Sequence, residues 1–233
     1  MVSSENDRSR TGGWRRAVAW PRVYVVLLAV TAHAQVPLGN GEILILVGPP
    51  GSGKTLQAGR LSKKYKIPSV SLASVVSEHL KSGRDVPKTL RASVAAGELL
   101  DDETAIGLVG VRIGQPDAAR GFILDGYPAT EAQAKHLEQF VAQHKLGTPI
   151  VLVLTAPDDV MRQRLRKRGR ADDTPANIER RIAEFHKERA FLEGWYTTQN
   201  SVTADSTGDP AQVFTRVEKA LGEVFARRAL KVR

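Results

Sequence analysis

The chain has 233 residues and a mass of 25.4 kDa, which is the length of one domain or of one domain with insertions. It contains no cysteine, and this excludes disulfides, thiolate zinc sites, iron–sulfur clusters and cysteine nucleophiles. Its 34 basic and 25 acidic residues give a formal net charge of +9. Such a charge suits a nucleic acid, an anionic membrane or an anionic small molecule as partner.

The N-terminal segment is expected to lie outside the fold. A basic stretch that ends at Arg22 is followed by an apolar run, residues 23–32, and by Ala32-His33-Ala34. This is the pattern of a secretory signal peptide, and the alternative is an unstructured extension. The apolar run is shorter than the ~20 residues that a membrane span needs. We therefore exclude residues 1–41 from the fold and expect no stable membrane association.

Strands and helices alternate in the predicted elements. Apolar runs typical of strands buried on both faces lie at residues 43–47, 69–72, 121–125 and 149–154, with a weaker one at 201–204. Between them, apolar residues recur with helical period, and two helices have clear starts at Thr174-Pro175 and Asp209-Pro210. Three sets of residues each share one face of a predicted helix. They are Ala134, Leu137, Val141 and His144; Ile178, Ile182, Phe185 and Leu192; and Val213, Val217, Leu221 and Val224. This alternation predicts an α/β doubly wound sheet.

A phosphate-binding loop follows the first predicted strand. Residues 48–55 read Gly-Pro-Pro-Gly-Ser-Gly-Lys-Thr, which is the Walker A pattern between a strand and a helix. The amides of Gly51, Ser52 and Gly53 can turn inward to form an anion nest at the helix N-terminus. Lys54 then supplies charge to the outer phosphates, and the Thr55 hydroxyl is placed to ligate Mg²⁺. The loop predicts a bound nucleoside triphosphate with Mg²⁺.

The loop by itself leaves hydrolysis and transfer to an acceptor open. A GTPase is expected to carry an N-K-x-D motif, and the sequence has none. A motor ATPase or helicase is usually larger and has consecutive acids after a strand, whereas the only acid at a predicted strand end is Asp125.

Further segments fall in one order and spacing. They are residues 97–103, 121–130, 164–174 and 180–182, and 121–128 reads Gly-Phe-Ile-Leu-Asp-Gly-Tyr-Pro. Together with the phosphate loop they resemble adenylate kinase and its nucleoside monophosphate kinase relatives, over residues 43–225. The resemblance implies a P-loop NTPase domain at 42–230, with three α/β/α layers around a five-stranded parallel sheet. It also implies a small helical insertion that binds the acceptor, at about 71–100, and a very short lid, at about 164–174.

The resemblance implies roles for residues on the donor side. Arg164 would lie near the adenine and Arg168 on the triphosphate, while Arg170 and Arg181 would contact the transferred phosphoryl group. Gly208 would belong to a loop whose backbone approaches the adenine. Asp125 would hold Mg²⁺ through water. Arginine suits this chemistry because its planar fork is permanently charged and bidentate, and the catalytic set would be Lys54, Arg168, Arg170 and Arg181.

The acceptor side departs from the family pattern. Ser77 and Ala129 replace two arginines that grip the acceptor phosphate, and Leu72 replaces a threonine near the acceptor base. The reaction implied is transfer of the γ-phosphoryl of ATP to AMP, giving two ADP. A different monophosphate or small acceptor, or a pseudokinase that binds ATP and turns over poorly, are the alternatives. The acceptor-binding set would be Glu98, Leu99, Leu100, Gly126, Ala129 and Gln133, with Gln133 reading the base.

The partners follow from this interpretation. ATP and a nucleoside monophosphate are expected. A nucleic acid is not, because neither interleaved aromatics nor a helix-turn-helix accompany the basic run at 162–170. Relatives with short lids imply a monomer. The need for ATP favours the cytoplasm, while the signal-peptide-like residues 1–34 leave export as the alternative.

Overall fold

The computed structural model describes residues 41–82, 90–91, 100–169, 173–196 and 200–231. All of them belong to the compact unit His33–Arg233. Residues 1–40 of the N-terminal segment, half of the predicted acceptor insertion and the middle of the predicted lid lie outside the described residues. So do three predicted site residues, Glu98, Leu99 and Arg170.

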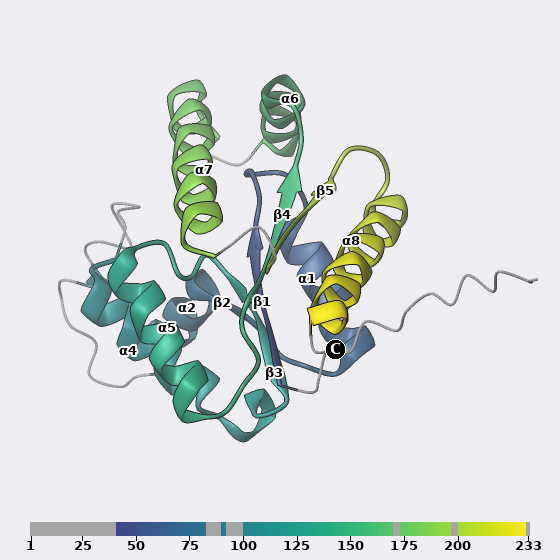
Figure 1. Ribbon diagram of the computed structural model, residues 1–233. Helices are drawn as coiled ribbons and strands as arrows, with labels where there is room; N and C mark the ends of the chain where they lie inside the picture. Colours follow the sequence, from purple (N-terminus) through teal and green to yellow (C-terminus); the bar gives the residue numbers. More distant parts are fainter. Residues whose placement is uncertain (1–40, 83–89, 92–99, 170–172, 197–199, 232–233) are drawn as a thin grey trace, which may run out of the picture. The chain divides into compact units, whose positions relative to one another are not determined.

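Five parallel strands form one sheet in the order β2-β3-β1-β4-β5 (Figure 1). This confirms the predicted parallel sheet, and each strand lies within one or two residues of its predicted run. Leu72 is the exception: it was expected to end the second strand but begins a helix, because Leu72, Val76 and Leu80 have helical spacing and pack in one cluster. The strands are β1 (Glu42–Val47), β2 (Ser69–Ser71), β3 (Gly121–Asp125), β4 (Ile150–Thr155) and β5 (Ser201–Asp205).

Helices connect the strands in the predicted places. The helix predicted at 134–144 ends one residue early, since His144 is its exposed C-terminal cap. A short 3-10 turn, η1 (Pro116–Ala118), precedes β3. The α-helices are α1 (Lys54–Tyr65), α2 (Leu72–Lys81), α4 (Asp102–Ile113), α5 (Glu131–Gln143), α6 (Asp158–Arg168), α7 (Pro175–Trp195) and α8 (Pro210–Lys231).

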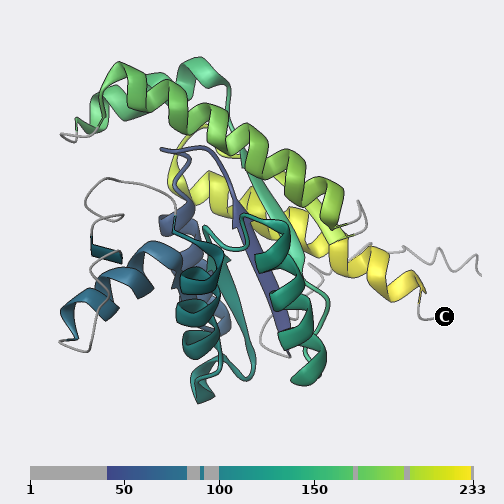
Figure 2. The ribbon, with the colours of Figure 1, turned by 90° about the vertical axis from the view of Figure 1, so that its left-hand side faces the viewer.

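The sheet is the middle of three layers. Alternate residues of β1 point to opposite sides: Ile43 and Ile45 join one core cluster, and Leu44 and Leu46 join the other. The first cluster is completed by α4, α5 and α7, and the second by α1 and α8. Figures 1 and 2 show the two groups of helices on either side of the strands. The α/β/α architecture predicted from the sequence is confirmed.

The sheet topology determines where a ligand can bind. The central strand β1 pairs with β3 on one side and β4 on the other, so chain connections diverge at its carboxyl end. Such a switch point is the usual ligand site of an open α/β sheet. The phosphate loop leaves β1 there, and Asp125 ends β3 beside it, in register with Leu46.

Among the helices of the described residues, none is both long and apolar enough to cross a bilayer.

Candidate active site

The phosphate loop runs from the end of β1 to the start of α1. Gly51 and Gly53 have φ values of +81° and +83°, in the left-handed region that glycine adopts without strain. At Gly48 a Cβ would lie 2.8 Å from Ser52 Oγ and 2.9 Å from Leu154 Cβ, so the space admits only glycine. No side chain caps the N-terminus of α1. Its first amides are therefore available to an anion, and the helix dipole favours negative charge there.

Lys54 lies over this loop. Its Nζ donates to Gly48 O at 2.5 Å and to Pro49 O at 3.4 Å. The ammonium group is thus held among the loop carbonyls, beside the amides that would face phosphate. Among the described residues, the buried Ser52 hydroxyl of the same loop has no hydrogen-bond partner.

Asp125 and Thr55 bring two oxygen ligands together next to the loop. Asp125 is 9% exposed. Burial raises its pKa, and both the charge of Lys54 and a hydrogen bond with the Thr55 side chain act in the opposite direction. A carboxylate and a hydroxyl are the hard oxygen donors that Mg²⁺ prefers, usually with several waters kept in place. The residues present therefore fit the predicted magnesium site.

Glu188 is a second carboxylate on this side of the sheet, and the sequence analysis missed it. It comes from α7, where it follows Phe185 by three residues and precedes Leu192 by four, so it shares their buried helix face. Burial raises the pKa of Glu188 to about 7, the charge of Lys54 lowers it, and Asp125 raises it further. A glutamate inside an otherwise apolar stripe was the signal that could have revealed it.

The raised pKa of Glu188 predicts how stability depends on pH. Between its ordinary value and about 7, the folded protein keeps a proton that the unfolded chain has released. The free energy of unfolding therefore falls as pH rises through this window, by up to about 3 kcal/mol. Glu188→Gln removes this loss, so the variant should match the wild type near about pH 4 and exceed its stability near about pH 8.

Urea unfolding of the nucleotide-free protein at both pH values measures this effect. Glu184→Gln, one helical turn earlier and paired with Arg180 on the surface, is the matched control. An equal stability difference between Glu188→Gln and wild type at both pH values would contradict the prediction.

Two of the predicted catalytic arginines share one buried carboxylate. Arg168, at the end of α6, donates to Asp173 through Nε at 2.9 Å and Nη2 at 2.5 Å. Arg181, from α7, donates through Nη1 to the same carboxylate at 3.0 Å. The Asp173 side chain is 1% exposed. The carboxylate thus aligns both guanidinium groups, which arrive from different helices.

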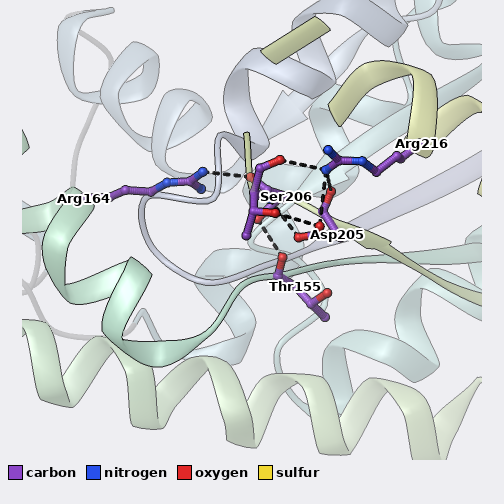
Figure 3. A network of polar contacts seen from close by, with 6 residues as sticks. Thr155, Arg164, Asp205, Ser206 and Arg216 are labelled. Carbon is purple, nitrogen blue, oxygen red and sulfur yellow. Dashed lines mark hydrogen bonds and ion pairs between the residues drawn. The ribbon is translucent and has the colours of Figure 1, made fainter. Parts of the chain in front are cut away.

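Arg164 joins α6 to the phosphate loop. Its guanidinium donates to Gly51 O at 3.4 Å. It also donates to Ser206 O at 2.9 Å (Figure 3). Arg168 lies one helical turn after Arg164 on α6. The contact between Arg164 and the phosphate loop therefore also positions Arg168 relative to that loop. A cavity of about 220 Å³ lies here, and its lining includes the predicted donor residues Gly51, Ser52, Gly53, Arg164 and Gly208.

A larger cavity, of about 310 Å³, lies elsewhere, between α5 and the end of α7. Glu138 and Trp195 are among the described residues that line it, and none of these residues is a lysine or an arginine. A triphosphate needs cationic groups, so the smaller cavity beside the phosphate loop is the better donor site.

Gln133, the predicted reader of the acceptor base, is engaged within the protein. It is 3% exposed. Its Oε1 accepts from Ala129 N at 2.8 Å, and its Nε2 donates to Asp102 Oδ1 at 2.8 Å. Thr130 Oγ1 donates to the same Asp102 oxygen at 2.7 Å. An acceptor base that bonds to Gln133 must compete with Asp102, a second residue that the sequence analysis missed.

The remaining acceptor positions are open to solvent or partly so. Gly126, with a φ of +77°, and Ala129 are exposed on the loop after β3. Leu100 and Ser77 are partly buried, and Ser77 lies on α2. Hydrogen bonds therefore tie Lys54 and Arg164 to the phosphate loop, while the acceptor set is described only in part.

Comparison with known proteins agrees with this geometry. The family model described as adenylate kinase matches residues 46–201. An adenylate kinase of Mesorhizobium japonicum is 36% identical over 189 residues, which cover 76% of this chain and 96% of that protein. Adenylate kinases of Mycobacterium ulcerans and Mycobacterium tuberculosis are 37% and 36% identical over 180 residues, covering 77% of this chain and 99% of each relative. The chain belongs to the adenylate kinase family.

Proposed function

We propose that this enzyme transfers the γ-phosphoryl group of ATP to AMP and forms two molecules of ADP. One observation carries the proposal: a chain of the adenylate kinase family keeps a complete phosphate loop, next to an acidic site and an arginine pair. An oxygen of the AMP phosphate attacks the γ-phosphorus, and the bond to the oxygen that bridges to the β-phosphate breaks. That oxygen leaves with ADP.

The donor residues hold the triphosphate still and neutralise it. Amides of Gly51, Ser52 and Gly53 bind its oxygens, and Lys54 exchanges its loop carbonyls for the outer phosphates. Phosphoryl transfer needs alignment and positive charge more than covalent help from the protein. The contact between Arg164 and Gly51 O supports a position for α6 directly beside the bound nucleotide.

The arginines act on the group in transfer. We assign Arg168 to the triphosphate, and Arg170 and Arg181 to the migrating phosphoryl group. Arg168 and Arg181 already converge on one carboxylate, which is the geometry that a phosphoryl group with its negative oxygens would exploit. Exchange of Asp173 for phosphate oxygens would close the lid segment and exclude water.

Magnesium is the cofactor that we propose for this site. When bound, it supplies positive charge to the phosphate oxygens. Asp125 and the Thr55 hydroxyl would hold it, with Asp125 acting through water. Their mutual hydrogen bond keeps both oxygens turned toward the same point, and the buried position of Asp125 limits access by bulk solvent.

Asp125→Asn should raise the magnesium concentration needed for half-maximal activity by about tenfold or more, since a carboxylate is a much stronger partner of the hydrated ion than an amide. A magnesium titration of the steady-state rate at saturating ATP measures this. Asp117→Asn, at an exposed ion pair with Arg112, is the control. An unchanged magnesium requirement in Asp125→Asn would remove the residue from the metal site.

The identity of the acceptor is tested by supplying ATP with AMP, CMP, UMP, GMP or dTMP and following ADP formation. Turnover with AMP is expected. Turnover with a different monophosphate alone would overturn AMP as substrate. ATP binding in calorimetry without turnover of any acceptor would indicate a pseudokinase and overturn the proposal.

Ala129 offers a gain-of-function test of the acceptor site. Ala129→Arg should lower KM for AMP about tenfold or more with little change in kcat, because one charge-assisted hydrogen bond contributes about 1.5–3 kcal/mol. Ala132→Arg adds the same charge three residues away, on an exposed position of α5, and should leave KM for AMP unchanged. An unchanged KM in Ala129→Arg would mean that this loop does not face the acceptor phosphate.

We further propose that a single chain works alone, as the resemblance to members of the family with short lids implies. The reaction consumes ATP, and this favours the cytoplasm as its compartment. Sequencing the N-terminus of protein recovered from native cells tests the location, and a mature start at Gln35 would indicate export instead.

A further inference from the structure

Arg216 of α8 donates hydrogen bonds to the loop between β5 and α8. Its Nη1 donates to Asp205 O at 2.8 Å, to Thr207 O at 2.7 Å and to Asp205 Oδ2 at 3.4 Å (Figure 3). The Asp205 carboxylate also accepts from Thr207, through its amide at 2.8 Å and its hydroxyl at 2.7 Å. One guanidinium nitrogen therefore ties the start of the loop to a point two residues later.

The other side of this loop is tied to β4 and α6. Thr155 O accepts from the Ser206 amide at 2.7 Å and from its hydroxyl at 2.8 Å. Ser206 O accepts from Arg164 at 2.9 Å. Ser206 is 1% exposed. The loop is thus held between two arginines, Arg164 from α6 and Arg216 from α8, as Figure 3 shows.

This loop forms one wall of the cavity beside the phosphate loop. Ser206 and Gly208 line the cavity together with Gly51 and Gly53 of the phosphate loop. Arg216 is not among the described residues that line it, and the hydrogen bonds described above connect it to Asp205 and Thr207. At Gly208, with a φ of +89°, an added Cβ would lie 2.9 Å from Gln212 Oε1 and 3.4 Å from Arg216 Nη2. The Arg216 guanidinium therefore packs closely against the loop that forms this wall of the cavity.

We propose that Arg216 is a positioning residue that fixes the wall of the pocket for the donor nucleoside, and so sets the affinity for ATP without touching it. The inference rests on the proposed function in taking this cavity as the site of the donor base. A flat purine binds tightly only between walls of fixed separation. If the loop that forms this wall is already rigid, nucleotide binding does not have to offset the free-energy cost of ordering it.

The experiment compares two ligands that share a phosphate tail. Calorimetry gives Kd for ATP and for inorganic tripolyphosphate, with wild type, Arg216→Ala, Arg216→Lys and Arg227→Ala. Arg227 is the matched control because it lies on the same helix and donates to a single backbone carbonyl, Ser201 O. Arg216→Ala should weaken ATP about tenfold or more and leave tripolyphosphate unchanged. Arg216→Lys should recover part of the loss, and Arg227→Ala should match wild type.

Steady-state kinetics supplies the second readout. Arg216→Ala should raise KM for ATP by a similar factor and leave kcat within about twofold, because the reacting groups stay in place. Equal weakening of ATP and tripolyphosphate would indicate general loosening of the fold and would overturn the proposal. So would unchanged ATP affinity. If Arg216→Ala does not fold, Arg216→Lys against wild type decides in the same way.

The outcomes also separate this inference from the proposed function. Wild type that binds ATP no more tightly than tripolyphosphate would overturn the nucleoside pocket, even with phosphoryl transfer to AMP intact. Absence of turnover with AMP in wild type would overturn the proposed function, while the binding comparison would still decide the role of Arg216.

Discussion

Replacing Lys54 with alanine is expected to lower kcat by about a thousandfold, the largest loss among the variants considered. The ammonium group is the cation that the phosphate loop itself contributes, and it lies within hydrogen-bond distance of Gly48 O and Pro49 O. Alanine leaves the loop amides in place but removes the positive charge that is proposed to bind the outer phosphates. Steady-state kinetics with ATP and AMP measures the loss.

The loss should be specific to the reaction. The Lys54 hydrogen bonds described above go to loop carbonyls, and its charge also lowers the pKa of the buried Asp125 and Glu188. The melting temperature of Lys54→Ala is therefore measured beside kcat, and a variant that stays folded at the assay temperature places the loss in the reaction. Lys63→Ala, at an exposed position of the same helix, is the control and should retain full activity. Undiminished turnover of Lys54→Ala would show that this loop does not bind the donor.

Replacing Arg181 with alanine should lower kcat by about a hundredfold to a thousandfold, with ATP affinity changed only a few-fold. The proposal places Arg181 on the phosphoryl group in transfer, where its interaction is stronger in the transition state than in the bound substrate. Arg181→Lys should recover little of the rate, because an ammonium group cannot reproduce the planar fork that now meets Asp173.

The neighbouring residue provides a close control. Arg180 is half exposed and donates to Glu184 on the outer face of α7, whereas Arg181 turns to the buried Asp173. Arg180→Ala should therefore keep full activity, although it removes the same charge one residue away. Similar rate losses in the two variants would mean that net charge, and not the placement of Arg181, determines the rate.

The strands were predictable because the chain buries them on both faces. Residues 43–47 and 149–154 are continuous apolar runs, and such runs have few other places in a soluble fold. Leu72 shows the limit of this argument. A single apolar residue after a strand continues the run equally well into a helix, and only its spacing to Val76 and Leu80 decides.

The phosphate loop was predictable for a different reason. Its chemistry is carried by the backbone of consecutive residues, so residues 48–55 specify it without information on distant parts of the chain. The shared carboxylate of Arg168 and Arg181, the position of Glu188 and the internal bonds of Gln133 depend on contacts between separate elements. A local pattern does not contain those contacts, although the carboxylate in the apolar stripe of α7 gave one hint.

The central claim is that the phosphate loop and the arginines of α6 and α7 act on one chain of phosphates. A crystal structure with a dinucleotide that joins ATP and AMP through their phosphates tests it most directly. We expect Lys54 and the loop amides on the donor phosphates, with Arg168 and Arg181 turned from Asp173 onto the phosphates between the two nucleosides. Arg170 is expected on the same phosphates. Phosphates bound away from the loop, or a closed lid with these arginines still directed elsewhere, would contradict the account.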